Sequence, residues 1–525
     1  MKHRLVAFFW GYGRHMLAIV AFLGACYHFQ YHKHLDTPYW PPHTWRQADA
    51  MAIAVHFYQN GMDLSDPRIL NELNPVAEGR AAGEFPLLYY TAAGLFHLTG
   101  GPSVLVFRAL WLTIWLAGLW ALFDLVYRKT KFFLLSAAIP VLVFSSPVAV
   151  AYAPSFVPNL PAMAFALLGL NFLDRYLQHG ALKRWYAAAG FFLLAGLTKV
   201  TMLALPLAML GVVAITGLWH LLHKRTAPAL QVYHPIHLAA GFIALFVPVI
   251  LWFQYVFRYN AENINHYFQT GTTPYWSLSE KRLAEISEQV GELWQQFYYS
   301  EQMQEVLWVL LALLPILWLL RPGKGGLLVF GLALGFAMYV LLFYYAFLNH
   351  DYYALDPLLL VALGLAVVAV QLKKILGWRL WRHTLVRSVL VIAVVYQTLT
   401  AADYGKHKFR ERFNWWAGEM LNPHLDDPEL QQKMLAAGIG PDAKVFTHPD
   451  FSPNRNLSLL QRHGYNQFTL AIHGIPLTQA ERLKDWGAEY AIFTTWDAAR
   501  EEQIPVSFRT DTLFYYKGIL AFRIQ

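Results

Sequence analysis

Long apolar runs recur along roughly the first 400 residues of the chain, separated by short polar loops. Each run is long enough to cross about 30 Å of hydrocarbon as a helix. Charged residues make up only 14% of the 525 positions and hydrophobic residues 57%, whereas ordinary soluble domains carry about 25% charged residues. The sequence therefore predicts a polytopic α-helical membrane protein.

About eleven membrane spans are predicted, with about thirteen as the upper count. They cover residues 15–30, 105–127, 132–153, 157–177, 185–199, 201–222, 236–257, 305–320, 326–348, 355–372 and 386–402. The segment "EFPLLYYTAAGLFHLTG" at 84–100 is apolar but short, and it begins with Glu84 and Pro86. Whether this segment crosses the membrane decides the orientation of every later span.

Lysine and arginine residues indicate that orientation, because they accumulate in short cytoplasmic loops. If 84–100 lies at the interface, the cytoplasmic loops hold Arg128, Lys129, Lys131, Arg175, Lys183, Arg184, Lys224, Arg225, Arg321, Lys324, Lys373, Lys374, Arg379 and Arg382. The short loops of the opposite face then carry almost no basic residue apart from Lys199. We therefore predict a juxtamembrane helix at 84–100, a cytoplasmic amino terminus and a carboxyl terminus on the outer face.

Three larger segments fall on the predicted outer face: 31–104, 258–304 and the tail. The chain is divided into a membrane module at 1–402 and a soluble α/β domain at 403–525. In the tail, "AKVFTHPD" and "EYAIFTTW" are typical of strands, "PLTQAERLKDWGA" of a helix that ends at Gly487, and "FYYKGILAFRI" of a closing strand or hairpin. The tail has no glycine-rich nucleotide loop, so a lid or packing role is favoured.

The charge and cysteine content exclude two classes of interpretation. The formal net charge of +8 comes from short basic clusters between apolar runs, so nucleic acid is not an expected partner. The single cysteine, Cys26, excludes an intramolecular disulfide. "LGAC" around Cys26 resembles a lipoprotein cleavage signal, but an uncleaved first span is favoured.

The unusual polar residues of the chain share the predicted outer face. They are Arg46, Gln47 and Asp49 in "WRQAD", Glu84 in "GEFP", Asn159 in "AYAPSFVPN", Lys199 in "LTKVT", and His350, Asp351 and Tyr352 in "LNHDYYALD". Most have a structural alternative: Lys199 could snorkel, Asp49 could pair with Arg46, Glu84, His350 or Asp351 could cap a helix, and Tyr352 could be an interfacial aromatic anchor. Polar groups near a membrane are costly unless they pair or serve a site, so their convergence indicates function.

The motifs "WRQADAMAIAVHFYQNG", "GEFPLLYY", "LTK" and "HDYYAL", in this order, resemble the bacterial branch of the GT-C glycosyltransferases, relatives of protein O-mannosyltransferases and lipid A aminoarabinose transferases. The tail segment "ERLKDWGAEYAIF" is similar to the outer domain of such proteins. The resemblance implies an enzyme of the bacterial inner membrane that transfers a sugar from a polyprenyl-phosphate donor. It also implies that Asp49 matches the catalytic acidic residue and that Lys199 contacts the donor phosphate.

One position departs from the pattern of these relatives. They often have an aspartate after the proline of the loop that reads "SFVPNLPAMAF" here, and this chain has Asn159. Asparagine supplies no negative charge, which weakens the case for a metal held between two acidic loops. We predict that no metal is required, with a divalent metal as the alternative.

The expected chemistry needs one base, because a phosphate-linked sugar already carries a good leaving group. Asp49 would accept the proton of the acceptor hydroxyl in a single inverting displacement. Arg46 and Lys199 would stabilise the leaving phosphate, with His350 and Tyr352 as further donor contacts. Gln47, Glu84, Asn159 and Asp351 are candidate sugar or acceptor contacts.

Other functions stay open at the level of sequence. A transporter or lipid flippase would favour inverted repeats and buried ionisable residues at the membrane midplane. An oligosaccharide ligase or polymerase with a diphosphate-linked donor would use a similar architecture. The acceptor is a lipid, a glycan or a protein, and the sequence does not distinguish these.

Overall fold

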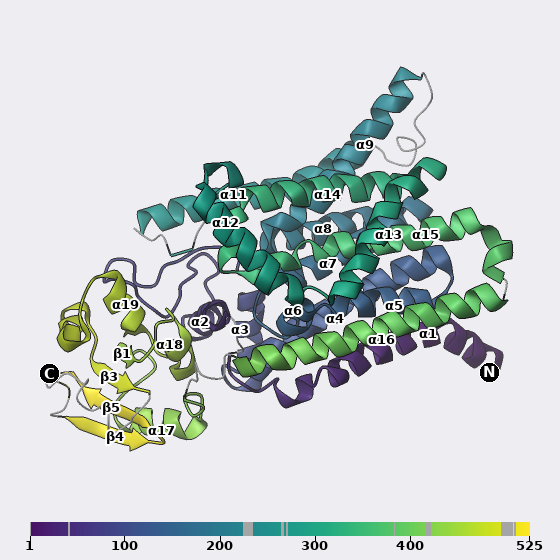
Figure 1. Cartoon of the computed structure of the whole chain (residues 1–525). Helices are drawn as coiled ribbons and strands as arrows, with labels where there is room; N and C mark the ends of the chain where they lie inside the picture. The colour runs from purple at the N-terminus through teal and green to yellow at the C-terminus, as the bar shows by residue number, and fades with distance from the viewer. Residues whose placement is uncertain are drawn as a thin grey trace.

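A helical bundle and a small β-sheet make up the chain (Figure 1). The computed structural model describes residues 2–39, 43–223, 235–263, 267–268, 271–382, 384–415, 422–494, 508 and 511–524. The sheet lies at one end of the bundle, and the amino terminus lies at the other end. We call the first the Asp49 end, because helix α2 with Asp49 lies there, and the second the Lys324 end.

The bundle contains most of the helical elements of the chain. They are α1 (Lys2–His28), η1 (Tyr31–Lys33), α2 (Thr44–Gln59), α3 (Leu87–Thr99), α4 (Val104–Thr130), α5 (Phe133–Phe144), α6 (Pro147–Tyr152), α7 (Asn159–His179), α8 (Leu182–Thr198), η2 (Val200–Leu203), α9 (Ala204–Leu222), α11 (Pro235–Glu262), η3 (Tyr275–Ser277), α12 (Glu280–Glu288), η4 (Gln289–Trp294), η5 (Gln295–Phe297), α13 (Glu301–Leu320), α14 (Lys324–Leu342), η6 (Tyr344–Leu348), η7 (Asp351–Leu355), α15 (Leu358–Arg382) and α16 (Thr384–Trp415).

Six helical segments in the described part of the chain are long and apolar enough to cross a membrane. They are Val104–Thr130, Val200–Trp219, Ile236–Glu262, Glu301–Leu320, Lys324–Leu342 and Asp351–Ile375. The predicted span at 132–153 forms two helices, α5 and α6, because Pro147 starts a new helix after Ser145 and Ser146. The predicted boundary at 402 falls within the continuous helix α16.

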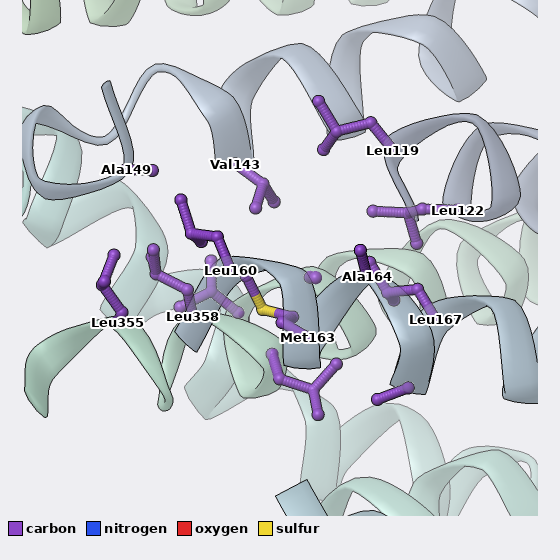
Figure 2. Close-up of a cluster of buried hydrophobic side chains, with 14 of the residues drawn as sticks. Leu119, Leu122, Val143, Ala149, Leu160, Met163, Ala164, Leu167, Leu355 and Leu358 are labelled. Carbon is purple, nitrogen blue, oxygen red and sulfur yellow. The ribbon is translucent and has the colours of Figure 1, made fainter. Parts of the chain in front are cut away.

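Helices α4 and α7 form the centre of the bundle. Their side chains enter one apolar core with residues of α5, α6, η7 and α15 (Figure 2). Gly118 of α4 lies directly against Ala164 of α7, and a Cβ on Gly118 would approach the Ala164 Cα to 2.5 Å. Small residues let helix backbones approach closely, which is how membrane helices gain packing energy without a strong hydrophobic driving force.

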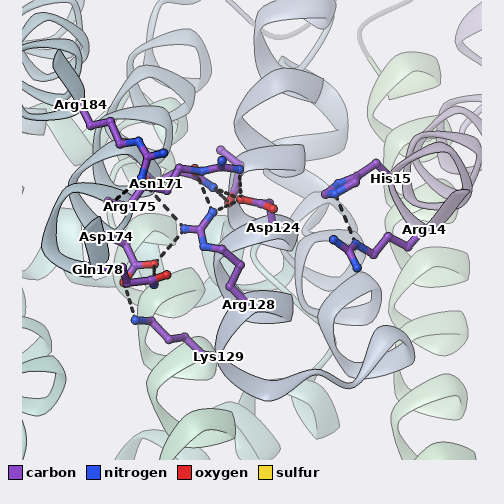
Figure 3. Close-up of polar contacts among 11 residues, drawn as sticks. Arg14, His15, Asp124, Arg128, Lys129, Asn171, Asp174, Arg175, Gln178 and Arg184 are labelled. Atoms are coloured by element: carbon purple, nitrogen blue, oxygen red, sulfur yellow. Dashed lines mark hydrogen bonds and ion pairs between the residues drawn. The ribbon is translucent and has the colours of Figure 1, made fainter. Parts of the chain in front are cut away.

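An ion-pair network joins α4 and α7 at the Lys324 end (Figure 3). Asp124 accepts hydrogen bonds from Arg128, from Asn171 at 2.9 Å and from Arg175 at 2.8 Å. Asp174 of α7 pairs in turn with Arg128 at 2.9 Å. The network satisfies charges that would be costly to leave unpaired at the edge of an apolar core.

The C-terminal domain is built on a five-stranded sheet with the order β2-β1-β3-β5-β4. Its elements are α17 (Pro428–Ala436), β1 (Val445–His448), α18 (Arg455–Leu460), β2 (Gly464–Asn466), α19 (Gln467–Ile472), η9 (Leu477–Trp486), β3 (Tyr490–Phe493), β4 (Thr512–Tyr516) and β5 (Ile519–Arg523). Strands β2, β1 and β3 are parallel, and β5 pairs antiparallel with both β3 and β4. The predicted strands, the closing hairpin and the helical segment that ends at Gly487 are confirmed.

The two faces of this sheet enter different cores. Successive side chains of a strand point to opposite faces, so the side chains of Val445 and Phe446 lie on opposite faces of the sheet. Val445 joins a core that contains residues of α2, α3 and α4, whereas Phe446 packs under α19 and η9. One face of the sheet therefore packs against the helices that carry the candidate site.

The segment between α1 and α4 also extends the sheet itself. Asn71 forms a parallel bridge with Gly464 at the edge of β2, with hydrogen bonds from Gly464 N to Leu70 O at 3.0 Å and from Glu72 N to Gly464 O at 2.9 Å. Glu72 is buried and pairs with Lys444 at 2.8 Å. The domain is thus attached by backbone pairing, an ion pair and shared apolar packing.

The close contact of α4 and α7 gives a testable prediction. Gly118→Ala should lower the free energy of unfolding by about 1–3 kcal/mol, because the new methyl group meets backbone that must shift. Gly190→Ala is the matched control, since nothing lies within 4 Å of a Cβ at this α8 position. Thermal unfolding of both purified variants in detergent checks the prediction, and equal melting temperatures would contradict it.

Candidate active site

A cavity of about 760 Å³ lies at the Asp49 end of the bundle, beneath the C-terminal domain. Its volume falls within the roughly 300–1,000 Å³ typical of ligand sites. It is lined by Trp45, Arg46, Asp49, Leu73, Asn74, Gly83, Glu84, Pro158, Asn159, Lys199, Val200, Thr201, Phe253, Tyr267, Phe268, Tyr339, Phe343, His350, Tyr352, Tyr353, Pro453, Phe468, Ile472 and His473. Segments from the whole length of the chain meet here.

Asp49 lies on α2 and is 5% exposed. Its Oδ1 accepts a hydrogen bond from the Tyr267 hydroxyl at 2.8 Å and another from Asn454 Nδ2 at 2.8 Å. Burial raises the pKa of Asp49 to about 6, although Arg46, Asn454 and Tyr267 all favour the charged form. A carboxylate with this pKa is largely ionised at neutral pH and can still take up a proton.

Arg46, one turn before Asp49, forms its ion pair with Glu84. The same Arg46 nitrogen, Nη2, donates to the Tyr89 hydroxyl at 3.1 Å, and the guanidinium lies over the Phe268 ring at 5.8 Å. Its Nη1 is buried and has no hydrogen-bond partner in the described part of the chain. Arg46 therefore retains a donor for a ligand, and its partner is Glu84 and not the i+3 carboxylate.

Glu84 is ionised although its side chain is partly buried. Burial alone would raise its pKa, but Arg46, a hydrogen bond from Tyr89 and the charge of Lys199 outweigh that effect and lower it. The chain beside Glu84 is fixed by a hydrogen bond from Phe85 N to Leu197 O at 3.1 Å. This bond brings the "GEFP" segment next to the end of α8.

Lys199 lies at the break between α8 and η2. Its backbone is extended, with φ −154° and ψ 111°, so the helix stops and the side chain reaches the cavity. The ammonium lies over the Tyr353 ring at 4.8 Å and has no ion pair among the residues described. A lysine in this position is a point charge available to an anion.

A third carboxylate, Asp356, lies behind the cavity wall close to Lys199 and is fully buried. It accepts hydrogen bonds from Asn159 Nδ2 at 2.7 Å and from Thr201 Oγ1 at 2.7 Å. Asn159 Oδ1 is buried without a partner in the described structure. The amide of Asn159 is thus oriented by Asp356, with its oxygen left for a hydroxyl or amide donor.

His350 and Tyr352 also line the cavity, and both rings contact the ring of His43. The His350 ring stacks on that of His43 at 5.5 Å between centroids, and Tyr352 meets His43 edge-on at 5.1 Å. Burial lowers the pKa of His350 to about 4, so the ring is neutral at pH 7. Because its Nδ1 lies 3.2 Å from the Ala346 carbonyl oxygen, Nδ1 carries the proton and Nε2 is an acceptor.

Of the nine residues predicted from the sequence, seven line this single cavity: Arg46, Asp49, Glu84, Asn159, Lys199, His350 and Tyr352. Gln47 and Asp351 do not line it. Asp351 lies behind the wall, where it accepts from Tyr152 at 2.7 Å and contacts His43 Nε2 at 3.1 Å. Its position fits a residue that orients His43.

Four participating residues were missed in the sequence. Asp356 and Tyr353 lie in "LNHDYYALD", so that motif already pointed to them. Tyr267 and Asn454 carried no signal, because a lone tyrosine or asparagine in a long polar segment has no distinctive neighbours. Asn454 comes from the C-terminal domain, whose Pro453, Phe468, Ile472 and His473 line the cavity.

No group of three or more His, Cys, Asp or Glu residues in the described ranges is arranged to hold a metal ion. The cavity carries two carboxylates, Asp49 and Glu84, and Glu84 is occupied by Arg46. What the arrangement offers is an ionised carboxylate beside two cations that can still bind an anion.

Comparison of the structure with solved structures identifies the fold. The chain matches ArnT from Cupriavidus metallidurans in the apo state with a TM-score of 0.56 and 13% identity, over 99% of this chain and 98% of that chain. The same protein bound to undecaprenyl phosphate matches with a TM-score of 0.55 and 14% identity, over 98% of each chain. The archaeal oligosaccharyltransferase AglB from Archaeoglobus fulgidus, in complex with an inhibitory peptide and a dolichol-phosphate, matches with a TM-score of 0.51 and 11% identity, over 92% of this chain and 70% of that one.

No family model matches the sequence, and no curated protein matches it significantly. Both ArnT and AglB have the GT-C fold. The fold implied by the sequence motifs is therefore confirmed over nearly the whole chain, at identities that establish the fold alone.

The partly buried ion pair of Arg46 and Glu84 gives a prediction about stability. Glu84→Gln should lower the free energy of unfolding by about 1–3 kcal/mol, because it leaves the partly buried Arg46 charge without its partner. Glu288→Gln, at an exposed position of α12, should melt like the wild type. Thermal unfolding in detergent measures both, and a wild-type melting temperature for Glu84→Gln would show that the pair contributes little.

Proposed function

We propose that this protein is a membrane glycosyltransferase that transfers a sugar from a polyprenyl-phosphate donor to an acceptor at the Asp49 end of the bundle. The observation that carries the proposal is the meeting, in one cavity, of a carboxylate whose pKa is about 6 with Arg46 and Lys199. The GT-C fold shared with an ArnT structure bound to undecaprenyl phosphate and an AglB structure with a dolichol-phosphate supports it.

Asp49 is the general base of the proposed reaction. It takes the proton of the acceptor hydroxyl while the hydroxyl oxygen attacks the anomeric carbon, and the bond from that carbon to the phosphate oxygen breaks. Tyr267 and Asn454 both bind Oδ1, and no described residue hydrogen-bonds Oδ2. Oδ2 is therefore the oxygen that accepts the proton. A single displacement inverts the anomeric configuration.

Arg46 and Lys199 stabilise the leaving polyprenyl phosphate, which gains charge as the bond breaks. Fixed cations lower the barrier most where charge develops in the transition state. Arg46 is held by Glu84 and Tyr89 with Nη1 still available, and Lys199 is held over Tyr353. The neutral His350 is better suited to accept a hydrogen bond from a sugar hydroxyl than to bind phosphate. Tyr352 and Asn159 are further sugar contacts. These residues need no metal for the proposed step.

The proposed topology follows the loop charges. The Lys324 end faces the cytoplasm, about eleven spans cross the inner membrane of a bacterium, and α3 lies at the interface. The Asp49 cavity and the C-terminal domain then face outward, where a polyprenyl-linked donor and a lipid, glycan or protein acceptor meet. Comparing lipid A, surface glycans and glycoproteins of a deletion strain by mass spectrometry would identify the acceptor by a single missing sugar.

An oligosaccharide transferase with a diphosphate-linked donor is the second candidate, favoured by the similarity to AglB. The two functions differ in donor length. Purified protein should transfer sugar from a defined polyprenyl-phosphate monosaccharide and not from a diphosphate-linked oligosaccharide. The reverse preference would support the second candidate, and transport of the lipid without transfer would support a flippase.

Replacing the proposed base tests the mechanism. Asp49→Asn should lower kcat by about 10²–10⁴-fold, because the amide cannot take up the proton. Its oxygen can still accept from Tyr267 and Asn454, so the variant should fold. Asp63→Asn, at an exposed position of the same segment, is the control. Transfer of labelled sugar in nanodiscs is the measurement, and near-normal turnover by Asp49→Asn would exclude Asp49 as the base.

The pKa of Asp49 gives a pH dependence of definite sign. The reaction needs the deprotonated form, so kcat/KM should fall about tenfold per pH unit below a midpoint near pH 6. Asn454→Ala removes a donor that favours the charged form, so the midpoint should move to higher pH. The midpoint does not depend on how much enzyme is folded, which separates this effect from loss of protein. An unchanged midpoint would contradict the role of Asn454.

A further inference from the structure

A second cavity, of about 710 Å³, lies at the Lys324 end of the bundle. Helix α14 separates it from the first: Lys324 and Leu328 line this cavity, and Tyr339 lines the Asp49 cavity. At a rise of 1.5 Å per residue, the stretch from Lys324 to Tyr339 spans about 22 Å. The second cavity is therefore a distinct site that the proposed transfer does not use.

The walls of the second cavity are almost entirely aliphatic and aromatic. Leu125, Leu173, Val212, Phe242, Leu328 and Val367 contribute from six different helices. Lipid acyl chains are as apolar as these side chains, so an acyl chain gains little free energy by leaving the bilayer for this cavity. Any preference for one lipid over another must come from polar groups at the rim.

The rim is cationic. Lys129, Lys324, Lys373 and Lys374 line the cavity with a single acidic residue, Asp174. Asp174 is engaged by Lys129 at 2.5 Å and by Arg128, as Figure 3 shows. Among the described residues, neither Lys324 nor Lys374 forms an ion pair. Two cations at the rim are thus available to an anion.

A buried acceptor lies beside these lysines. Gln371 of α15 lines the cavity and is only 4% exposed. Its Nε2 donates to the Arg321 carbonyl oxygen at 3.2 Å, and its Oε1 has no hydrogen-bond partner in the described structure. A buried amide oxygen without a hydrogen-bond partner is destabilising, so a bound hydroxyl at this point would be stabilising.

The loop at the rim is held in place for such a ligand. Besides the bond from Gln371, Arg321 donates to the Lys374 carbonyl oxygen at 2.7 Å, which ties the loop to α15. Gly323 and Gly325 line the cavity without side chains that would fill it. Helix α14 starts here with no side-chain cap, so its free N–H groups add to the positive potential.

We propose that this cavity binds an anionic glycerophospholipid. The phosphate lies at Lys324 and Lys374, a headgroup hydroxyl donates to Gln371 Oε1, and the acyl chains lie between the helices. Phosphatidylglycerol has this combination of a phosphodiester and a free hydroxyl. The site is independent of sugar transfer, because it lies at the other end of α14 and shares no lining residue with the Asp49 cavity.

Native mass spectrometry of the full chain released from nanodiscs of equimolar phosphatidylglycerol and phosphatidylcholine tests the proposal. The wild type should retain phosphatidylglycerol in preference to phosphatidylcholine. Lys324→Gln combined with Lys374→Gln should reduce that preference about 25-fold, since each lysine near an anionic lipid contributes roughly fivefold. Lys131→Gln combined with Lys183→Gln is the control, because both lysines are exposed, lie at the same end and do not line the cavity.

A second measurement, the melting temperature, shows that the variant pair folds and whether the lipid stabilises it. Phosphatidylglycerol added to delipidated protein in detergent should raise the melting temperature of the wild type and of the control pair, and not that of the Lys324 and Lys374 pair. Inorganic phosphate at the same concentration should have no such effect, because it lacks the chains. Equal retention of the two lipids by the wild type, or equal stabilisation by free phosphate, would overturn the proposal.

Discussion

The side chain of Asn454 joins the two halves of the molecule at the candidate site. Its Oδ1 accepts from the Asn71 backbone at 2.9 Å, and its Nδ2 donates to Asp49 at 2.8 Å. Asn454 is fully buried, so both bonds form away from water, where they are strongest. Docking of the C-terminal domain thus removes Asp49 from solvent and also supplies one of the two donors that hold its oxygen.

The sequence predicted the convergence of residues but not the framework that holds them. Loop charges and motif order placed Asp49, Lys199 and His350 on one predicted face, because they predicted a direction for each apolar run. Asn454 lies 405 positions from Asp49 along the chain, and no local pattern encodes such a contact. The predicted lid or packing role for the tail did not anticipate its contribution to the cavity wall.

Secondary structure was readable where the apolar pattern was long or strictly alternating. The helix break at Lys199 was visible because a lysine interrupts two apolar runs, and the closing hairpin because "YYKGI" turns through Gly518 at φ 86°. The break between α5 and α6 was missed, since Ser145, Ser146 and Pro147 sit inside a run that is apolar enough to read as one span. Length and hydropathy alone do not reveal a helix that restarts at a proline.

The strand-like pairing of residues 70–72 with β2 bears on how the chain can be dissected. In the intact protein, this segment covers the edge of the sheet at Gly464, and α2 and α3 cover one of its faces. A fragment starting at residue 403 would uncover both. It would present unpaired backbone groups on β2 beside an apolar surface, the combination that drives edge-to-edge aggregation. The tail is therefore one part of a single folding unit that also includes residues 70–72, α2 and α3. An excised tail would be a poor reagent for studying acceptor binding.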